Sequence, residues 1–349
     1  MKRTVPLLLV FVLLFSGCGV QSKPATAQFF ALDTLMSVTV YGRRAEENCT
    51  ALQQEVNRLD GLWSRTRPDS EISHLNEAAG GEPVTLSQDT LTLLSRAVEL
   101  HDLTDGALDV TIAPVMDTWG FGTAASFGEA TYRVPPQSEL DALLPFVNAD
   151  RLVLTEDTGF LPVSGMAVDL GAMAKGRLSD LLRQQLMGDG VSSALLDLGG
   201  NITVLGNKPD GSPWKVGIKN PQNDSDYFCV LSLADKTCST SGGYERYFEQ
   251  DGVRYHHILD PKTGYPAETG LLSVTVVSQD GTLADALSTA CFVLGPEKAE
   301  ALWRSQGQAL GFDLVLVRTD SQVLVTEGLQ QGFDFQGEDA GYHYEILYR

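Results

Sequence analysis

One segment, TLADALSTACFVLG at residues 282–295, has a helical pattern but carries apolar side chains on nearly every face. A helix of this kind is stable only when other elements cover it, so the chain must build a core around it. At 349 residues the chain is long enough for one large domain or two closely packed ones. The segment therefore predicts a buried helix within a substantial hydrophobic core.

Two polar residues of this helix, Asp285 and Thr289, are four positions apart and therefore share one face. A carboxylate and a hydroxyl suit Mg²⁺, which takes few protein ligands and completes its shell with water and phosphate oxygens. A hydrogen-bonded pair inside the core explains the same spacing without any ligand. The pattern leaves both interpretations open.

The rest of the chain alternates between helical and strand patterns. Helices are predicted at 45–64, 86–106, 176–190 and 297–307, and strands at 29–42, 191–206, 214–221, 229–234, 245–259, 271–279, 312–319 and 322–329. The second helix has Ser87 as its predicted N-cap and Gly106 as its stop. No internal repeat, low-complexity block or long linker divides residues 29–349. We therefore expect an α+β fold in which helices pack against mixed β-sheets, in two halves that meet at a cleft.

The first residues, MKRTVPLLLVFVLLFSGC, have the pattern of an export signal: basic residues, a short apolar run, and small residues before Cys18. The apolar run is too short for a comfortable transmembrane helix. The pattern resembles a bacterial lipobox, with Phe15 where leucine is usual, and it predicts lipidation of Cys18. An ordinary signal peptide with a coincidental cysteine is the alternative.

The predicted organisation is a signal peptide at 1–17, lipidated Cys18 with a tether at 18–28, and one folded domain at 29–349. The domain is expected to be anchored by lipid to a bacterial cell membrane, on its extracytoplasmic side. The net charge of −20 argues against a nucleic-acid partner, because a phosphate backbone requires a basic face. An anionic ligand would need a metal ion, helix N-termini or a few well-placed Lys and Arg side chains.

Four cysteines remain after Cys18, and none has the spacing of a zinc site. Cys229 and Cys238 flank VLSLADKT, so a disulfide across a hairpin is one interpretation in an oxidising compartment. Buried free thiols are the other, and the sequence does not choose between them.

Three loops place polar groups beside glycines. Asp109 lies among apolar residues, where its carboxylate needs a partner, either as the N-cap of a following helix or toward a ligand. Asp169 and Lys175 flank a predicted helix start, which suits phosphate or a metal ion, although a capped helix with a surface lysine is the alternative. Gly199 and Gly200 separate two strands and allow another backbone or a flat ligand to approach closely.

The stretch YHHILDPKTGYP, residues 255–266, places two histidines beside a turn shaped by Asp260, Pro261 and Gly264. Either both histidines pack around the turn, or one of them handles a proton or a phosphate. An imidazole with its ordinary pKa of about 6.5 has an appreciable neutral fraction at neutral pH, which suits a general base.

Taken together and in this order, these segments resemble the ApbE family of FAD:protein FMN transferases. The resemblance covers nearly all of the chain after the tether and rests on DTLMSVTVYG, SRTRPDSEISHLN, GALDVTIAPV, VDLGAMAKG, LLDLGGNITVLG, STSGGYERYF, HHILDPKTGYP and DALSTACFVLG. It implies that FMN is transferred from FAD to a Thr or Ser hydroxyl of a target protein, with AMP released. The implied targets are subunits of respiratory redox complexes or other exported flavoproteins that bear a Ser/Thr-Gly-Ala-Thr-like site.

The resemblance also assigns roles to residues. The implied Mg²⁺ ligands are the backbone carbonyl of Ala172 and the side chains of Asp285 and Thr289. The implied FAD contacts are Met36, Ala107, Leu108, Asp109, Asp169, Lys175 and Ile258. His257 matches the family's histidine, whose implied role is to assist deprotonation of the acceptor hydroxyl, whereas His256 has no such match.

One departure from the family pattern is Thr66, where relatives often have tyrosine. An aromatic stack on the flavin or adenine is then missing, or Trp63 or Trp119 supplies it. Two other functions remain compatible with the same motifs: a Mg²⁺-dependent FAD pyrophosphatase that yields FMN and AMP, and a lipoprotein that binds flavin without catalysis.

Overall fold

The computed structural model describes residues 23–122 and 132–349. The predicted signal peptide, Cys18 and the first part of the tether lie outside these residues. Within the described chain, nine strands form one large sheet, with neighbours antiparallel except for the last pair. The spatial order is β1 (Ala25–Ala31), β2 (Thr34–Val40), β6 (Ala194–Asp197), β7 (Asn201–Leu205), β10 (Lys236–Gly242), β13 (Leu271–Ser278), β14 (Phe312–Arg318), β15 (Gln322–Thr326) and β17 (His343–Leu347).

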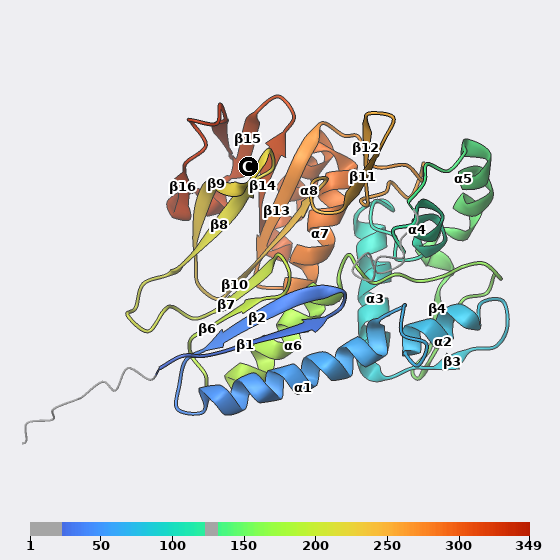
Figure 1. Ribbon diagram of the computed structural model, residues 1–349, viewed down its shortest axis with the longest axis horizontal. Coiled ribbons are helices and arrows are strands. Elements are labelled where there is room, and N and C mark those ends of the chain that lie inside the picture. Colours follow the sequence, from blue (N-terminus) through green and yellow to red (C-terminus); the bar gives the residue numbers. More distant parts are fainter. Residues whose placement is uncertain (1–22, 123–131) are drawn as a thin grey trace, which may run out of the picture.

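Smaller sheets and the helices surround this large sheet (Figure 1). The smaller sheets are β16–β9–β8 (Phe333–Phe335, Asn223–Leu233, Trp214–Asn220), β3–β5–β4 (Val84–Thr85, Thr158–Phe160, Val153–Leu154) and the pair β11–β12 (Tyr247–Gln250, Val253–His256). The helices are α1 (Ala45–Trp63), α2 (Glu71–Glu77), α3 (Gln88–Leu103), α4 (Ala113–Trp119), α5 (Gln137–Leu143), α6 (Ala174–Gly188), α7 (Gly281–Leu294) and α8 (Pro296–Leu310). Short 3-10 turns occur at η2 (Leu144–Phe146), η3 (Ala149–Arg151) and η4 (Glu327–Gly332).

Alternate residues of a strand point to opposite sides of a sheet. In β13 and β14 both sets of residues are buried, so both faces of the large sheet are covered there. Val274, Val276 and Leu316 belong to the core shared with α1, α6, α7 and α8. Val277 and Val315 belong to a second core, which the sheet β16–β9–β8 covers. The protein is therefore layered as helices, large sheet and small sheet, which confirms the predicted α+β class.

Helix α7 lies in the middle of these layers, against β10, β13, α6 and α8. Eleven of its residues are buried, including Asp285. Its N-cap is Asp280, whose side chain accepts a hydrogen bond from the Leu283 N–H. The buried helix predicted at 282–295 is confirmed, since elements from every side remove its apolar faces from water.

The predicted strand at 29–42 is wrong in two respects: it is a hairpin, β1–β2, and β1 begins earlier in the chain, at Ala25. Its two-residue turn, Leu32 and Asp33, has positive φ values of 46° and 56°. This is the backbone geometry of the turns that match strand twist, and it usually appears as Asn-Gly or Asp-Gly. The turn brings Asp33 to the mouth of the cavity described below.

The predicted strand at 245–259 is likewise a hairpin, β11–β12, turned at Asp251 and Gly252. Its own aromatic side chains join a cluster with rings from α4, from the segment after it and from the histidine loop (residues 257–266). The rings are Trp119, Phe121, Tyr132, Phe248, Tyr255 and Tyr265. This third cluster holds the hairpin and the histidine loop beside α4.

Cys229 lies in β9 and Cys238 in β10, so they belong to two different sheets rather than to one hairpin. All four described cysteines are buried free thiols. Burial raises the pKa of Cys238 to about 12, so this thiol stays protonated. Within the described residues, no helix has the length and apolar content needed to cross a membrane.

Candidate active site

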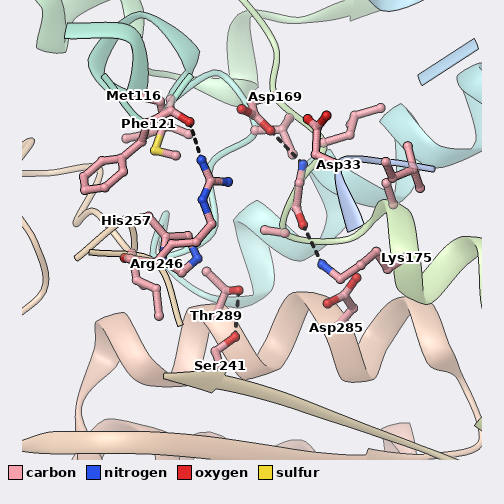
Figure 2. Close-up of a pocket in the computed structure, with 18 of the residues that line it drawn as sticks. Asp33, Met116, Phe121, Asp169, Lys175, Ser241, Arg246, His257, Asp285 and Thr289 are labelled. Carbon is pink, nitrogen blue, oxygen red and sulfur yellow. Dashed lines mark hydrogen bonds between the residues drawn. The ribbon is translucent and has the colours of Figure 1, made fainter. Parts of the chain in front are cut away.

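A cavity of about 470 Å³ opens where the large sheet meets the aromatic cluster. Several parts of the chain line it: the β1–β2 turn, the loop after α1, the segment 107–112, α4 and Phe121 after it, Gly199 and Asn201, the end of β10 with Arg246 after it, the loop before α6 with the start of that helix, α7, and the histidine loop. Figure 2 shows Lys175 and Asp285 on one side of this cavity and Arg246 and His257 on the other.

Helices α6 and α7 form the floor of the cavity. Both carboxylate oxygens of the buried Asp285 accept hydrogen bonds, one from the Gly176 N–H at 2.8 Å and one from the Ser239 hydroxyl at 3.2 Å. The first bond satisfies a free N–H in the first turn of α6, where Met173 at the N-cap supplies no side-chain acceptor. Asp285 therefore joins the two helices as well as facing the cavity.

The helical floor also brings together the predicted metal ligands. Ala172, Asp285 and Thr289 all line the cavity, and the Thr289 hydroxyl lies 3.2 Å from the Ser241 hydroxyl. A carboxylate has about four lone-pair positions, so Asp285 keeps free lone pairs beyond its two hydrogen bonds. Among the described residues no three His, Cys, Asp or Glu side chains gather as a metal centre, so zinc-type ligation has no support there. One carboxylate, one hydroxyl and a backbone carbonyl fit a hard cation that keeps several waters.

Asp169 lies on the same side, before α6. Its Oδ1 accepts a hydrogen bond from the Gly171 N–H at 2.7 Å, and its Oδ2 forms an ion pair with Arg65 Nε at 2.7 Å. Arg65 also pairs with Asp117, so two carboxylates neutralise this buried guanidinium. Lys175 donates to the Gly171 carbonyl at 3.4 Å, which leaves its ammonium group with further donors at the cavity.

Asp109 is not the N-cap of α4, because Ile112 holds that position. Its carboxylate is buried and accepts hydrogen bonds from the Thr111 N–H and hydroxyl and from the Ala149 N–H. His101 Nδ1 lies 3.3 Å from the same carboxylate. The Asp109 side chain is therefore bound by protein donors and holds the segment 107–112 in place along the cavity wall.

The histidine loop is built as the sequence predicts. The Asp260 carbonyl accepts from the Gly264 N–H at 2.8 Å, and Gly264 has a φ of 73°, which favours glycine. The Asp260 side chain accepts from the Lys262 N–H at 2.8 Å. The turn presents His257 and Ile258 to the cavity.

The two histidines have different surroundings. His256 packs edge-to-face on Phe292, with 5.4 Å between ring centroids, and burial lowers its pKa to about 4. His257 Nδ1 lies 3.1 Å from the Arg246 carbonyl oxygen, which can only accept, so Nδ1 carries the proton. The lone pair therefore resides on Nε2. Burial, followed by the charge of Arg246, lowers the pKa of His257 to about 3, which keeps the ring neutral.

The structure places all of the sequence-predicted contacts of the described chain in the cavity lining except one. Met36 is fully buried in β2, and the neighbouring turn residues Leu32, Asp33 and Thr34 line the cavity instead. Trp119 also lies outside the lining, where its Nε1 donates to the Gly264 carbonyl at 2.7 Å. The lining does include Trp63, Thr66 and Phe121.

Arg246 and Asp33 also line the cavity, and neither was predicted from the sequence to do so. Burial raises the pKa of Asp33, and the charge of Arg246 partly counteracts this. Arg246 stands in the quoted motif STSGGYERYF, but its position facing the cavity depends on Phe121, whose carbonyl accepts from Arg246 at 2.8 Å. No local pattern marks a contact between residues so far apart in the chain.

The fold and the cavity together define a ligand-binding α+β protein whose cleft combines oxygen donors suited to a metal ion, a neutral histidine and several cationic side chains. The chain belongs to the ApbE family, whose family model matches residues 32–312. This confirms the family predicted from the sequence.

Curated relatives cover most of the chain. An FAD:protein FMN transferase of Treponema pallidum is 36% identical over 333 residues, 89% of this chain and 91% of the relative. An FAD:protein FMN transferase of Vibrio cholerae is 33% identical over 317 residues, 89% of this chain and 93% of the relative. The chain is thus a member of a family of transferases, as the sequence predicts.

Solved structures agree with the fold. The ApbE protein of Thermotoga maritima superposes with a TM-score of 0.81 at 31% identity, covering 90% of this chain and 99% of that one. The flavin transferase ApbE from Vibrio cholerae gives a TM-score of 0.74 at 29% identity, covering 85% and 94%. The layered architecture is therefore that of solved flavin transferases.

Proposed function

We propose that this protein transfers FMN from FAD to a Thr or Ser hydroxyl of an acceptor protein and releases AMP. The observation that carries the proposal is the meeting of His257 with Asp285 and Thr289 in one cavity. These groups come from the histidine loop and from α7, and together they supply a base and oxygen ligands for a cation. The names of the relatives, FAD:protein FMN transferase, support the same reaction.

In the proposed reaction, the acceptor oxygen forms a bond to the phosphorus of the FMN half of FAD. The bond from that phosphorus to the bridging oxygen breaks, and AMP leaves with the electron pair. The acceptor proton passes to His257 Nε2, which is free to accept it because Nδ1 donates to the Arg246 carbonyl. An anionic phosphate beside the ring favours the imidazolium form, so FAD itself would raise the low pKa of His257.

A Mg²⁺ ion would be held by the Ala172 carbonyl, Asp285 and Thr289, where it would neutralise phosphate charge. The remaining side chains would position FAD. Asp169 is oriented by Arg65, and Lys175 offers ammonium donors near the start of α6. Local cations and a metal would also explain how a chain of net charge −20 binds an anionic dinucleotide.

We further propose that the acceptor carries a Ser/Thr-Gly-Ala-Thr-like site and belongs to an exported flavoprotein or a respiratory redox complex. The proposed anchor is lipid on Cys18, which would place the domain on the extracytoplasmic side of the membrane. The leader sequence described above supports this placement. Metabolic labelling with a fatty-acid analogue tests it, and a Cys18→Ser variant should lose both the label and membrane association.

The transferase is tested with the chain from residue 24 onward, FAD, Mg²⁺ and a small acceptor domain bearing a Ser-Gly-Ala-Thr site. Intact acceptor mass and AMP release are followed together. A mass gain equal to an FMN phosphoester, lost when Mg²⁺ is chelated, is the expected result. AMP and free FMN with two different acceptor sequences unmodified would instead identify a pyrophosphatase. Flavin binding without release of AMP would identify a non-catalytic flavin carrier.

A further inference from the structure

Two arginines line the cavity, and they differ in whether carboxylates neutralise their charge. The Arg65 side chain is 12% exposed and lies between the carboxylates of Asp169 and Asp117. Arg246 has no carboxylate within ion-pair distance among the described residues, and its described hydrogen bond goes to the neutral Phe121 carbonyl. The guanidinium of Arg246 thus keeps its full charge at the cavity wall.

Part of the Arg246 guanidinium is also unsatisfied. Its Nε atom is buried and lacks a hydrogen-bond partner among the described residues. A buried N–H without an acceptor costs free energy, and the cost is larger when the group is charged. A ligand that brings an anionic oxygen to this point would remove the cost.

Arg246 is connected directly to the proposed base. Its carbonyl oxygen accepts hydrogen bonds from both the His257 N–H, at 3.0 Å, and His257 Nδ1, at 3.1 Å. Arg246 and His257 therefore form one rigid unit on the wall opposite Lys175 and Asp285 (Figure 2). An anionic group bound by Arg246 would lie beside the base.

We propose that the Arg246 guanidinium binds the phosphate of FAD that the acceptor hydroxyl attacks. This inference rests on the proposed function and adds a residue and a subsite to it. A guanidinium presents parallel N–H donors that match two oxygens of a phosphate, which an ammonium group cannot do. The Arg246 backbone holds His257 while its side chain holds the phosphate, so one residue aligns base and electrophile.

The two sides of the cavity then divide the pyrophosphate between them. Arg246 binds the phosphate that becomes part of the acceptor, and the side with Lys175 and Asp285 receives the phosphate that leaves with AMP. Charge that develops on the attacked phosphate is stabilised by a donor already in place.

The test compares the affinities of FMN and riboflavin, which differ only in one phosphate, by quenching of flavin fluorescence in metal-free buffer. Arg246→Gln should weaken FMN binding by about tenfold to a hundredfold, because a charge-assisted hydrogen bond is lost. Riboflavin binding should stay within about twofold. Arg246→Lys should lose less FMN affinity than Arg246→Gln, because it keeps the charge without the paired donors.

Arg254→Gln is the matched control. Arg254 lies on the same hairpin, is 49% exposed and pairs with Glu249 away from the cavity. It should leave the affinities of both flavins unchanged.

Four other outcomes would overturn the inference, and each leads to a different conclusion about Arg246 or about flavin binding. Equal losses for FMN and riboflavin in Arg246→Gln would show a structural role through Phe121 rather than phosphate binding. Unchanged FMN affinity in both Arg246 variants would exclude the contact. A wild-type protein that binds FMN no better than riboflavin would exclude a phosphate subsite but leave flavin binding standing. A wild-type protein that binds no flavin would overturn the proposed function as well.

Discussion

The helical side and the loop side of the cavity are built in different ways. On the helical side, Asp285 is held by Gly176 and Ser239, and Asp169 is held by Gly171 and Arg65. On the loop side, Arg246 Nε has no hydrogen-bond partner among the described residues, and His257 keeps an acceptor nitrogen.

This difference indicates that the two sides of the cavity have different roles. Carboxylates held by protein donors have fixed positions and still keep lone pairs, which suits groups that hold a cation in defined geometry. Donors and acceptors left unused by the protein are ready for a substrate, because their bonds form only when it arrives. The helical side is thus preorganised for binding, and the loop side is prepared for chemistry.

The largest expected effect is on the helical side, in Asp285→Asn. We expect AMP release in the presence of Mg²⁺ to fall at least about a thousandfold, because the carboxylate that holds the metal is lost. The free energy of unfolding should also fall, by about 1–3 kcal/mol, because one amide oxygen cannot accept from both the Gly176 N–H and the Ser239 hydroxyl. The rate of AMP release in quenched time points measures the first effect, and urea denaturation measures the second.

Asp180→Asn separates the two effects. Asp180 also joins α6 to α7, by accepting from the N–H groups of Gly281 and Thr282, but it lies outside this cavity. It should lose comparable stability and keep its AMP release. If Asp180→Asn lost activity as strongly, the effect of Asp285 would be attributed to helix packing and not to the metal.

On the loop side, His257→Gln should slow transfer to the acceptor by about a hundredfold to ten thousandfold, because general base catalysis is lost. FAD affinity should change little, since the ring is neutral and its Nδ1 bond is internal. Acceptor flavinylation is measured by intact mass under saturating FAD. A variant that transferred normally but bound FAD weakly would contradict the base role.

The histidines also make stability depend on pH. Both His256 and His257 have folded-state pKa values below the ordinary value of about 6.5, so the unfolded chain binds protons first as pH falls. At alkaline pH both rings are neutral in the folded and the unfolded chain, so neither affects the free energy of unfolding. Below about pH 6.5 that free energy falls, at up to about 1.4 kcal/mol per pH unit for each histidine, until pH reaches about 4 for His256 and about 3 for His257. His256→Gln should reduce this slope. Urea denaturation from pH 7.5 to pH 4.5 tests it, and an unchanged slope would show that His256 is accessible to protons in the folded state.

The smallest effect is expected for Asp117→Asn on the helical side. The Asp117 side chain is 52% exposed, and Arg65 keeps its bond to Asp169 when Asp117 is neutral. Because water solvates the exposed Asp117 carboxylate, this pair contributes about 0–1 kcal/mol, so FAD affinity should change by no more than about fivefold. Fluorescence titration measures it, and a much larger loss would mean that Arg65 depends on both carboxylates to orient Asp169.

Much of the fold could be predicted because its signals are local. The apolar helix α7 and the capped helix α3 follow from periodicity and from Ser87. The two hairpins were missed for different reasons. Asp251-Gly252 is a readable hairpin signal within the segment predicted as one strand, whereas Leu32-Asp33 lacks the glycine that usually marks such a turn.

The sequence by itself determined the family, the buried helix with Asp285 and Thr289, and the turn that presents His257, because motifs and periodicity are properties of neighbouring residues. Only the tertiary structure decided which of the two cavity arginines is neutralised by carboxylates. Arg65 and Arg246 are both arginines near a recognisable motif, yet distant carboxylates neutralise the first and a neutral carbonyl receives the second. The free energy of a charged group depends on what folding places around it, and that environment comes from parts of the chain more than fifty residues away.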